Sequence, residues 1–166
     1  MSVAFRRESD EEHLEPKFAI PIPPGPNLVT PRGKALIDGA VLAAEAAVTA
    51  ATDDAAQIAA KRELSYWQTR QITAEILLPP TGSRVEFGII VIFTLNSKTR
   101  TLTIVGLDEA DAAQNMIGFT APLARAMMGA QVGDILPFGG SDDAIEILSI
   151  NPAISLAAVP SARSTP

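Results

Sequence analysis

TPRGKALIDGAVLAAEAAVTAATDDAAQ, residues 30–57, contains the whole of one predicted helix and the start of a second. Thr30 followed by Pro31 favours a helix start, because a hydroxyl can cap the backbone and the first helical position needs no N–H. The Ala- and Leu-rich run that follows predicts a helix to Ala51. Apolar side chains recur in it at steps of three and four, on a face suited to a partner helix: Ile37, Ala40, Ala44, Ala47 and Ala51.

The break at Thr52, Asp53 and Asp54 separates this helix from the next. Asp54 and Gln57 have capping-box spacing, so Asp54 is expected to cap a second helix that runs to about Leu78 before two prolines. Two long helices with a tight connection form an antiparallel hairpin of about 30 Å. A seam is expected along the second helix: Leu64, Trp67, Gln71, Ala74 and Leu78.

The flanking segments differ in character from this pair. Residues 1–27 combine charges with five prolines between Pro16 and Pro26, which predicts a flexible extended arm. After a linker at 79–84, β-branched runs at 85–95 and 99–105 predict a strand hairpin. A short helix at 123–128 and strands at 135–138 and 144–150 complete a small domain, and 151–166 is expected to be a flexible tail. The sequence thus predicts an α+β protein with a helical hairpin at 28–78 and a domain at 85–150.

Composition excludes several kinds of chemistry. The chain has no cysteine and one histidine, His13, so thiol nucleophiles, thiolate metal sites and histidine triads are excluded. A formal net charge of −6 disfavours nucleic-acid binding by the chain's own field. No apolar run approaches the ~20 residues of a membrane span, and we therefore expect a cytoplasmic protein without a membrane partner.

Three C-terminal motifs carry a specific resemblance. The segments 104–111 (IVGLDEAD), 121–129 (APLARAMMG) and 132–134 (VGD) resemble the C-terminal domain of the Gre transcript cleavage factors. The segment 28–33 (LVTPRG) resembles the start of that family's coiled coil. The resemblance implies an N-terminal antiparallel coiled coil followed by an FKBP-like domain.

The resemblance also implies a function. Members of the family bind bacterial RNA polymerase through the C-terminal domain and insert the coiled coil into its secondary channel, near the 3′ end of the nascent RNA. Acids at the hairpin tip help to hold Mg²⁺ and a water, so that the polymerase cuts its own backtracked RNA. The resemblance therefore implies an accessory elongation factor, with no enzyme activity and no intrinsic cofactor of its own.

Asp53 and Asp54 are the candidate tip acids, and Asp53 is the candidate ligand for a Mg²⁺ shared with the polymerase. The alternative is that the two carboxylates only cap the second helix. The family places an Asp and a Glu three residues apart in a longer loop, whereas these two are adjacent. Both arms are also shorter than in the family by about two turns, or ~11 Å.

Candidate partner contacts come from the C-terminal motifs: Asp108, Glu109, Asp111, Pro122, Arg125 and Gly129. The three acids are expected in a solvated turn, with at most a contact to the partner. Tyr66 and Trp67 are expected in core or interdomain packing. Basic residues of the second helix are expected on a solvated face: Lys61, Arg62 and Arg70.

Three other functions stay open from the sequence. A shortened hairpin is compatible with a Gre-like inhibitor that occupies the channel without cleavage activity. The chain also resembles the regulator of nucleoside diphosphate kinase, which pairs a short coil with a similar domain. An FKBP-like domain further allows a prolyl isomerase or chaperone, although such pockets are lined by aromatics and this domain has few.

Overall fold

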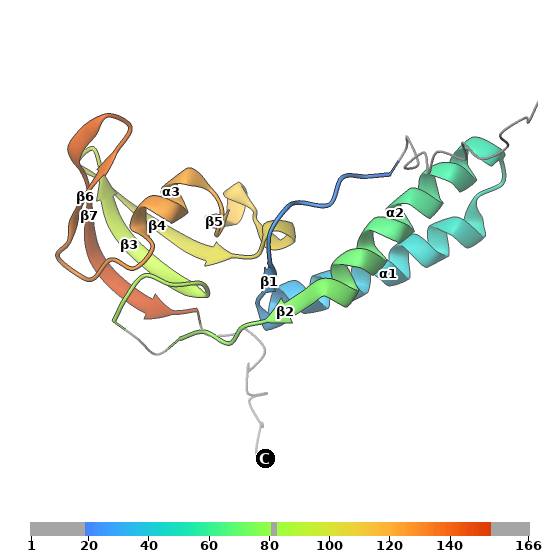
Figure 1. Cartoon of the computed structure of the whole chain (residues 1–166), viewed down its shortest axis with the longest axis horizontal. Coiled ribbons are helices and arrows are strands. Elements are labelled where there is room, and N and C mark those ends of the chain that lie inside the picture. Colours follow the sequence, from blue (N-terminus) through green and yellow to red (C-terminus); the bar gives the residue numbers. More distant parts are fainter. Residues whose placement is uncertain (1–18, 81–82, 154–166) are drawn as a thin grey trace, which may run out of the picture.

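The computed structural model describes residues 19–80 and 83–153, and it consists of two helices at one end and a sheet at the other (Figure 1). The sheet is mixed and has five strands, while a separate two-stranded sheet joins it to the helices. The prediction of an α+β protein is confirmed. Residues 1–18 and 154–166, which hold most of the predicted arm and tail, lie outside the described residues.

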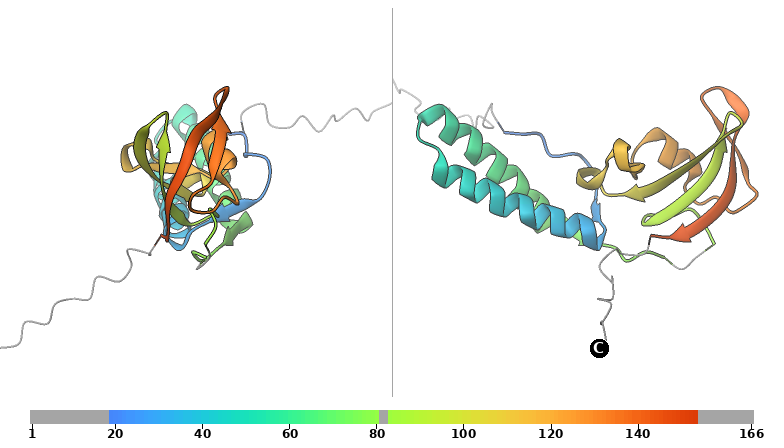
Figure 2. Two further views of the ribbon diagram at one scale, coloured as in Figure 1. Left: turned by 90° about the vertical axis from the view of Figure 1, so that its left-hand side faces the viewer. Right: turned by 180° about the vertical axis from the view of Figure 1, so that it is seen from behind.

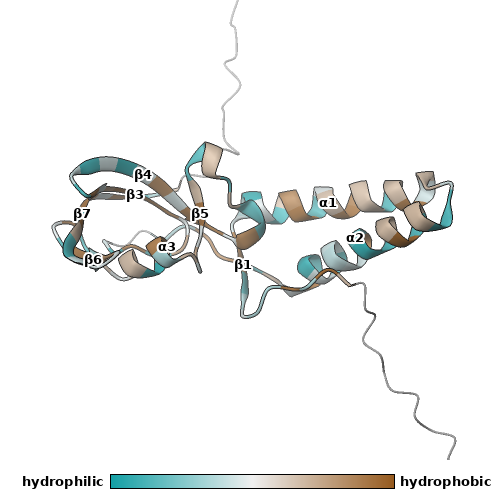
Figure 3. Ribbon diagram, turned by 90° about the horizontal axis from the view of Figure 1, so that it is seen from above, coloured by the Kyte–Doolittle hydropathy of each residue, from teal (hydrophilic) through white to brown (hydrophobic). Residues whose placement is uncertain are grey.

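Two helices of equal length, α1 (Pro31–Ala50) and α2 (Asp54–Thr73), lie side by side (Figure 2). Thr30 caps α1 as predicted, since its Oγ1 accepts a hydrogen bond of 3.0 Å from Gly33 N. Hydrophobic and hydrophilic bands alternate along both helices (Figure 3). The buried line of α1 differs slightly from the predicted stripe, because Ala47 is exposed and the buried positions are Gly33, Ile37, Val41 and Ala44.

Both ends of α2 differ from the prediction. The N-cap is Asp53, whose Oδ1 accepts a 2.8 Å hydrogen bond from Ala56 N, so the capping box expected for Asp54 is wrong. At the other end α2 stops at Thr73, and the predicted seam contact of Leu78 is wrong because Leu78 is 74% exposed.

A short parallel strand pair explains the early end of α2. The chain enters and leaves the helical pair at the same end, where β1 (Asn27–Val29) and β2 (Ala74–Ile76) run side by side. The extended backbones of β1 and β2 form hydrogen bonds with each other. If α2 continued by a further turn, the backbone groups of β1 would lose these partners. Asn27 therefore belongs to a strand and not to the arm.

The five-stranded sheet has the order β5-β4-β3-β7-β6. Its strands are β3 (Ile89–Leu95), β4 (Lys98–Val105), β5 (Met116–Gly118), β6 (Ile135–Phe138) and β7 (Ser141–Pro152). A two-residue turn with positive φ at Asn96 (49°) and Ser97 (62°) connects β3 to β4, as the twist of a hairpin favours. The helix α3 (Pro122–Met127) packs Met127 against the buried side chains of the sheet.

Several boundaries of this domain differ from the prediction, most clearly those of β3 and β7. β3 begins at Ile89, because Val85 instead exchanges backbone hydrogen bonds with the segment after α3, from Gly129 N (2.7 Å) and to Ala130 O (2.8 Å). β7 extends to Pro152, two residues into the predicted tail, through its pairing with the start of β3. Across the described residues, none of the helices is both long and apolar enough to cross a bilayer.

Candidate functional site

The two candidate tip acids lie exposed at the end of the helical pair that is remote from the sheet (Figure 1). Asp53 uses one carboxylate oxygen to cap α2, whereas Asp54 lies in the first turn, where negative charge favours the positive end of the helix dipole. The roles expected for the two acids are therefore exchanged, and Asp54 is the one with no part in the cap. In the part of the chain that the structure describes, no group of three or more His, Cys, Asp or Glu residues gathers.

Two of the three acids expected in a solvated turn, Asp108 and Glu109, instead form a junction between the sheet domain and the helical pair. Both belong to the short 3-10 helix η1 (Leu107–Glu109), and the side chain of Asp108 is only 10% exposed. Arg70 Nε of α2 donates a 2.6 Å hydrogen bond to Asp108 Oδ2, and Tyr66 Oη donates one of 2.8 Å to Asp108 Oδ1. The solvated position expected for Asp108 is therefore wrong.

Burial of the junction is clearest at Arg70, whose side chain is 2% exposed. Its backbone carbonyl accepts a 2.7 Å hydrogen bond from Asn27 Nδ2 of β1, so Arg70 links β1 to the sheet domain. The expectation that Arg70 lies on a solvated basic face is wrong. Partial burial and, next, the hydrogen bond to the anionic Asp108 raise the pKa of Tyr66 to about 12.

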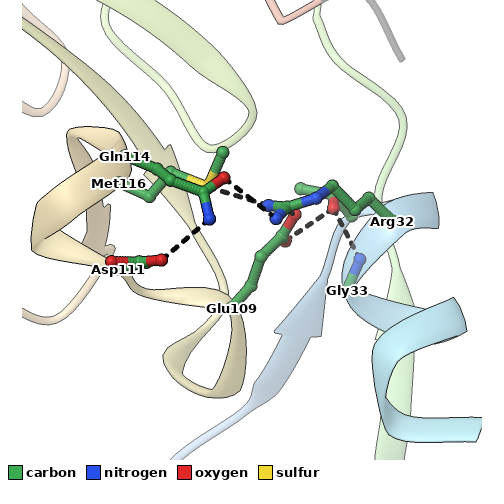
Figure 4. A network of polar contacts seen from close by, with 7 residues as sticks. Arg32, Gly33, Glu109, Asp111, Gln114 and Met116 are labelled. Carbon is green, nitrogen blue, oxygen red and sulfur yellow. Dashed lines mark hydrogen bonds and ion pairs between the residues drawn. The ribbon is translucent and has the colours of Figure 1, made fainter. Parts of the chain in front are cut away.

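A second network centres on Glu109 (Figure 4). Thr30 Oγ1 donates a 2.6 Å hydrogen bond to Glu109 Oε2, and Arg32 Nη1 lies 3.2 Å from Glu109 Oε1. The Glu109 side chain is 3% exposed, so the solvated position expected for it is also wrong. Its carboxylate sits at the first turn of α1, where free N–H groups favour an anion.

Arg32 extends this second network across the surface of the sheet domain. Its guanidinium also contacts Gln114 Oε1 (3.4 Å) and Met116 Sδ (2.8 Å), on the segment that leads into β5. Asp111 completes the network by accepting a 2.8 Å hydrogen bond from Gln114 Nε2. One arginine at the start of α1 thereby touches three separate positions of the sheet domain.

Two glycines allow the backbones to approach at this junction. A Cβ on Gly33 would lie 2.7 Å from Glu109 Oε2, and a Cβ on Gly106 would lie 2.6 Å from the carbonyl oxygen of Leu28. Real Cβ atoms do not approach other atoms so closely. The two motifs that contain these glycines, residues 28–33 and 104–111, therefore face each other across the junction.

The other candidate contact residues stay on the surface. Asp111 caps the 3-10 helix η2 (Ala112–Gln114) by accepting a hydrogen bond from Ala113 N (2.9 Å). Pro122 and Arg125 are exposed on one side of α3, three residues apart, and Gly129 is exposed with a φ of +82°. Of the six candidates, the structure thus encloses two and leaves four accessible.

Sequence reasoning missed Arg32 and Arg70 on the helix side of the junction. The interdomain packing expected for Tyr66 is observed, because its hydroxyl contacts Asp108 of the sheet domain. A signal was present for Arg70, because it follows Trp67 by three residues on the apolar seam of α2. A cation on a buried seam requires a buried anion, and the acids at 108 and 109 were the available ones.

Comparison with known proteins identifies the sheet domain. Residues 80–152 match the family model described as transcription elongation factor GreA/GreB, C-term. The chain is 35% identical over 89 residues to transcription elongation factor GreB of Neisseria meningitidis, covering 49% of this chain and 55% of that one. It is 38% identical over 80 residues to transcription elongation factor GreA of Yersinia pestis, covering 46% and 51%. The chain thus spans about half the length of the curated relatives it matches.

Among solved structures, the chain is similar to that of GreA factor homolog 1 (Gfh1) of Thermus thermophilus. The match has 17% identity and a TM-score of 0.36, and covers 76% of this chain and 99% of that one. The sequence matches above confirm the resemblance that the C-terminal motifs indicated, because residues 80–152 are similar to the C-terminal domain of the GreA/GreB factors.

Proposed function

We propose that this chain is an accessory elongation factor of bacterial RNA polymerase, which acts in the cytoplasm and is not itself an enzyme. The observation that carries this proposal is the match of residues 80–152 to the GreA/GreB C-terminal domain. The attached helical pair supports it, because a rigid projection beside a docking domain can enter a channel of the partner.

The two parts of the chain have separate roles, docking and projection. Residues 85–150 form an FKBP-like docking domain, residues 28–78 form a coiled-coil hairpin, and 79–84 link the two. Each helix has 20 residues, so the hairpin projects by about 30 Å. The buried Asp108 and Glu109 hold the base of the hairpin against the domain, so the docked domain determines where the tip points.

The tip acts inside the secondary channel, close to the 3′ end of the nascent RNA. Asp54 and the second oxygen of Asp53 contribute ligands to a Mg²⁺ held mainly by the polymerase, since two adjacent carboxylates are too few for a resident site. Any RNA cleavage is then performed by the polymerase. A tip that stops short of the metal would instead obstruct the channel and inhibit.

Retention of the chain by purified bacterial RNA polymerase tests docking. We expect Arg125→Glu, on the exposed side of α3, to weaken retention at least tenfold. Lys98→Glu makes the same charge change at the exposed β3–β4 turn and serves as the matched control. Retention by nucleoside diphosphate kinase with none by the polymerase would replace this proposal with the kinase-regulator function.

Cleavage of RNA in backtracked complexes tests the tip. We expect wild type to stimulate cleavage and Asp54→Ala to lose the stimulation. Asp53→Ser keeps an N-cap while removing a charge, so it separates the cap from the metal function. Absence of stimulation by wild type, together with slower elongation, would identify a channel-occupying inhibitor.

The structure offers nothing specific for a prolyl isomerase. Phe93 is fully buried and packs in the core, and Phe87 is 8% exposed and stacks edge-to-face on Phe119 at 5.8 Å. These aromatic side chains pack within the domain.

A further inference from the structure

The first half of β4 forms an open edge of the five-stranded sheet. β5 pairs with β4 only at residues 103–105, and the strand order places no further strand on that side. Within the described residues, the backbone of residues 98–102 therefore pairs with β3 alone. The start of β4 is also hydrophilic, as Figure 3 shows.

Alternate residues of β4 present their backbone groups at this edge. Thr103 N donates a 2.9 Å hydrogen bond to Asn115 O, and Val105 O accepts one of 3.0 Å from Phe119 N. The odd-numbered residues thus face the β5 side, and the alternation of an antiparallel pair directs the N–H and C=O groups of Thr99 and Thr101 the same way. No strand among the described residues lies beyond these two threonines, so their backbone groups can pair with an added strand.

A groove of about 600 Å³ runs along the open edge, in line with β5. Three of its lining side chains are apolar and also pack against the core of the domain: Leu102, Ile117 and Leu123. Arg100 is an exposed lining residue, and no acid is among the residues that line the groove. Arg100 takes part in none of the ion pairs formed within residues 19–80 and 83–153. The groove therefore combines an apolar wall, a cation and an unpaired strand edge.

This combination favours one kind of occupant. A charged side chain on an edge strand can by itself discourage pairing, but an extended peptide beside an open edge gains backbone hydrogen bonds and places alternate side chains in the groove. Arg100 and Leu102 are two residues apart and so lie on one face of β4. A strand added there would set two of its own side chains beside them, and an acid and an apolar side chain are the complementary ones. Because a surface ion pair contributes only about 0.2–1 kcal/mol, the backbone and apolar contacts would supply most of the affinity and the charge would select the sequence.

We propose that the open edge of β4 binds an extended acidic peptide segment by strand addition, with an acid beside Arg100 and an apolar side chain beside Leu102. The bound segment continues the line of β5 over about five residues, or ~16 Å. The exposed residues of α3 that the docking proposal uses, Pro122 and Arg125, do not line this groove. The inference therefore goes beyond the proposed function and does not depend on it.

Nuclear magnetic resonance of the full chain with a synthetic peptide tests the site. The probe is the acetylated and amidated pentapeptide Val-Thr-Glu-Thr-Val, which reads the same in both directions, and its control has lysine in place of glutamate. We expect the probe to slow hydrogen exchange at the N–H groups of Thr99 and Thr101. Thr103 N–H serves as an internal control, because it already donates to Asn115 O.

Two N-methylated versions of the probe test the backbone pairing without any change to the protein. One carries methyl groups on the two threonine nitrogens, and the other carries them on the glutamate and valine nitrogens. Only alternate N–H groups of an added strand face β4, so one version should lose binding and the other should keep it. Loss with the threonine methyl groups indicates an antiparallel strand, and loss with the other set indicates a parallel one.

Two variants of the chain test the charge. We expect Arg100→Glu to weaken binding of the probe by about threefold or more. Lys61→Glu makes the same charge change on α2, where the residue is exposed, and should leave binding unchanged.

Four outcomes would overturn the proposal. Unchanged exchange at Thr99 and Thr101 would show that the edge does not take a strand, and equal binding of the lysine peptide would show that acids are not selected. Equal effects of the two methylation patterns would exclude strand addition. Protection that appears without peptide and rises with the concentration of the chain would assign the edge to a second copy.

Discussion

Arg70 offers the sharpest test of the junction, because its side chain is 2% exposed and it forms an ion pair with Asp108, itself 10% exposed. Arg70→Met keeps most of the side-chain volume but leaves the Asp108 carboxylate buried without its cation. Breaking a buried ion pair from one side costs about 3–5 kcal/mol, mostly for the stranded charge. At a urea m-value of about 2 kcal/mol/M, the unfolding midpoint should fall by about 1.5–2.5 M.

The double variant Arg70→Met/Asp108→Leu separates a stranded charge from lost packing. Replacing both members of a buried pair by apolar residues is often neutral, so we expect the double variant to regain more than half of the loss. The hydroxyl of Tyr66 loses its acceptor in this variant but can turn to water, because Tyr66 is only half-buried.

Urea unfolding followed by Trp67 fluorescence measures the effect at the right place. Trp67 is the only tryptophan and contacts the Tyr66 ring edge-to-face at 5.0 Å, next to the ion pair. Far-ultraviolet circular dichroism shows whether the helices and the sheet unfold together. The single variant Asp108→Leu completes the comparison. Additive losses in Arg70→Met, Asp108→Leu and the double variant would refute a coupled buried pair.

Further predictions concern four single positions. In α1, Gly39→Ala should stabilise by up to about 1 kcal/mol, because its added Cβ meets nothing within 4 Å. Gly33→Ala should destabilise despite the same gain in helix propensity, because its Cβ meets Glu109; chemical unfolding of the two variants compares them directly. Since the pKa of Tyr66 is raised from 10.0 to about 12, stability should be full below pH 10 and fall between pH 10 and 12. Melting temperatures of Tyr66→Phe across that range should show a smaller decline. Asp53→Ala should cost about 1 kcal/mol in thermal unfolding, and Asp53→Ser much less.

Local signals predicted most elements of this chain. Thr30 before Pro31 places the start of α1, and runs of β-branched residues identify β3 and β4. The strand at 135–138 was predicted with its observed bounds. Such features depend on neighbours in sequence, which is why they can be read without the fold.

The features that could not be predicted depend on distant partners. Three-residue strands such as β1 and β2 have too little sequence for a pattern, and each exists because the other lies beside it. In the sequence, Asp108 and Glu109 resemble a solvated turn. In the fold they contact Arg70 and Thr30, which lie 38 and 79 residues earlier in the chain. Burial of a charge is decided by its partner, so the acids alone could not show it.

The position of the junction explains how a short hairpin can keep a fixed direction relative to the sheet domain. All the contacts that orient it, from Thr30 and Arg32 on α1 to Tyr66 and Arg70 on α2, lie in the half nearest the sheet domain. Removing equal numbers of turns from the outer ends of both helices would leave every one of these contacts in place. Each residue removed from both arms moves the tip by about 1.5 Å along an unchanged direction. Reach can therefore vary among proteins with this arrangement while docking and direction stay the same, and the effect on the partner would then depend on arm length and on the acids at the tip.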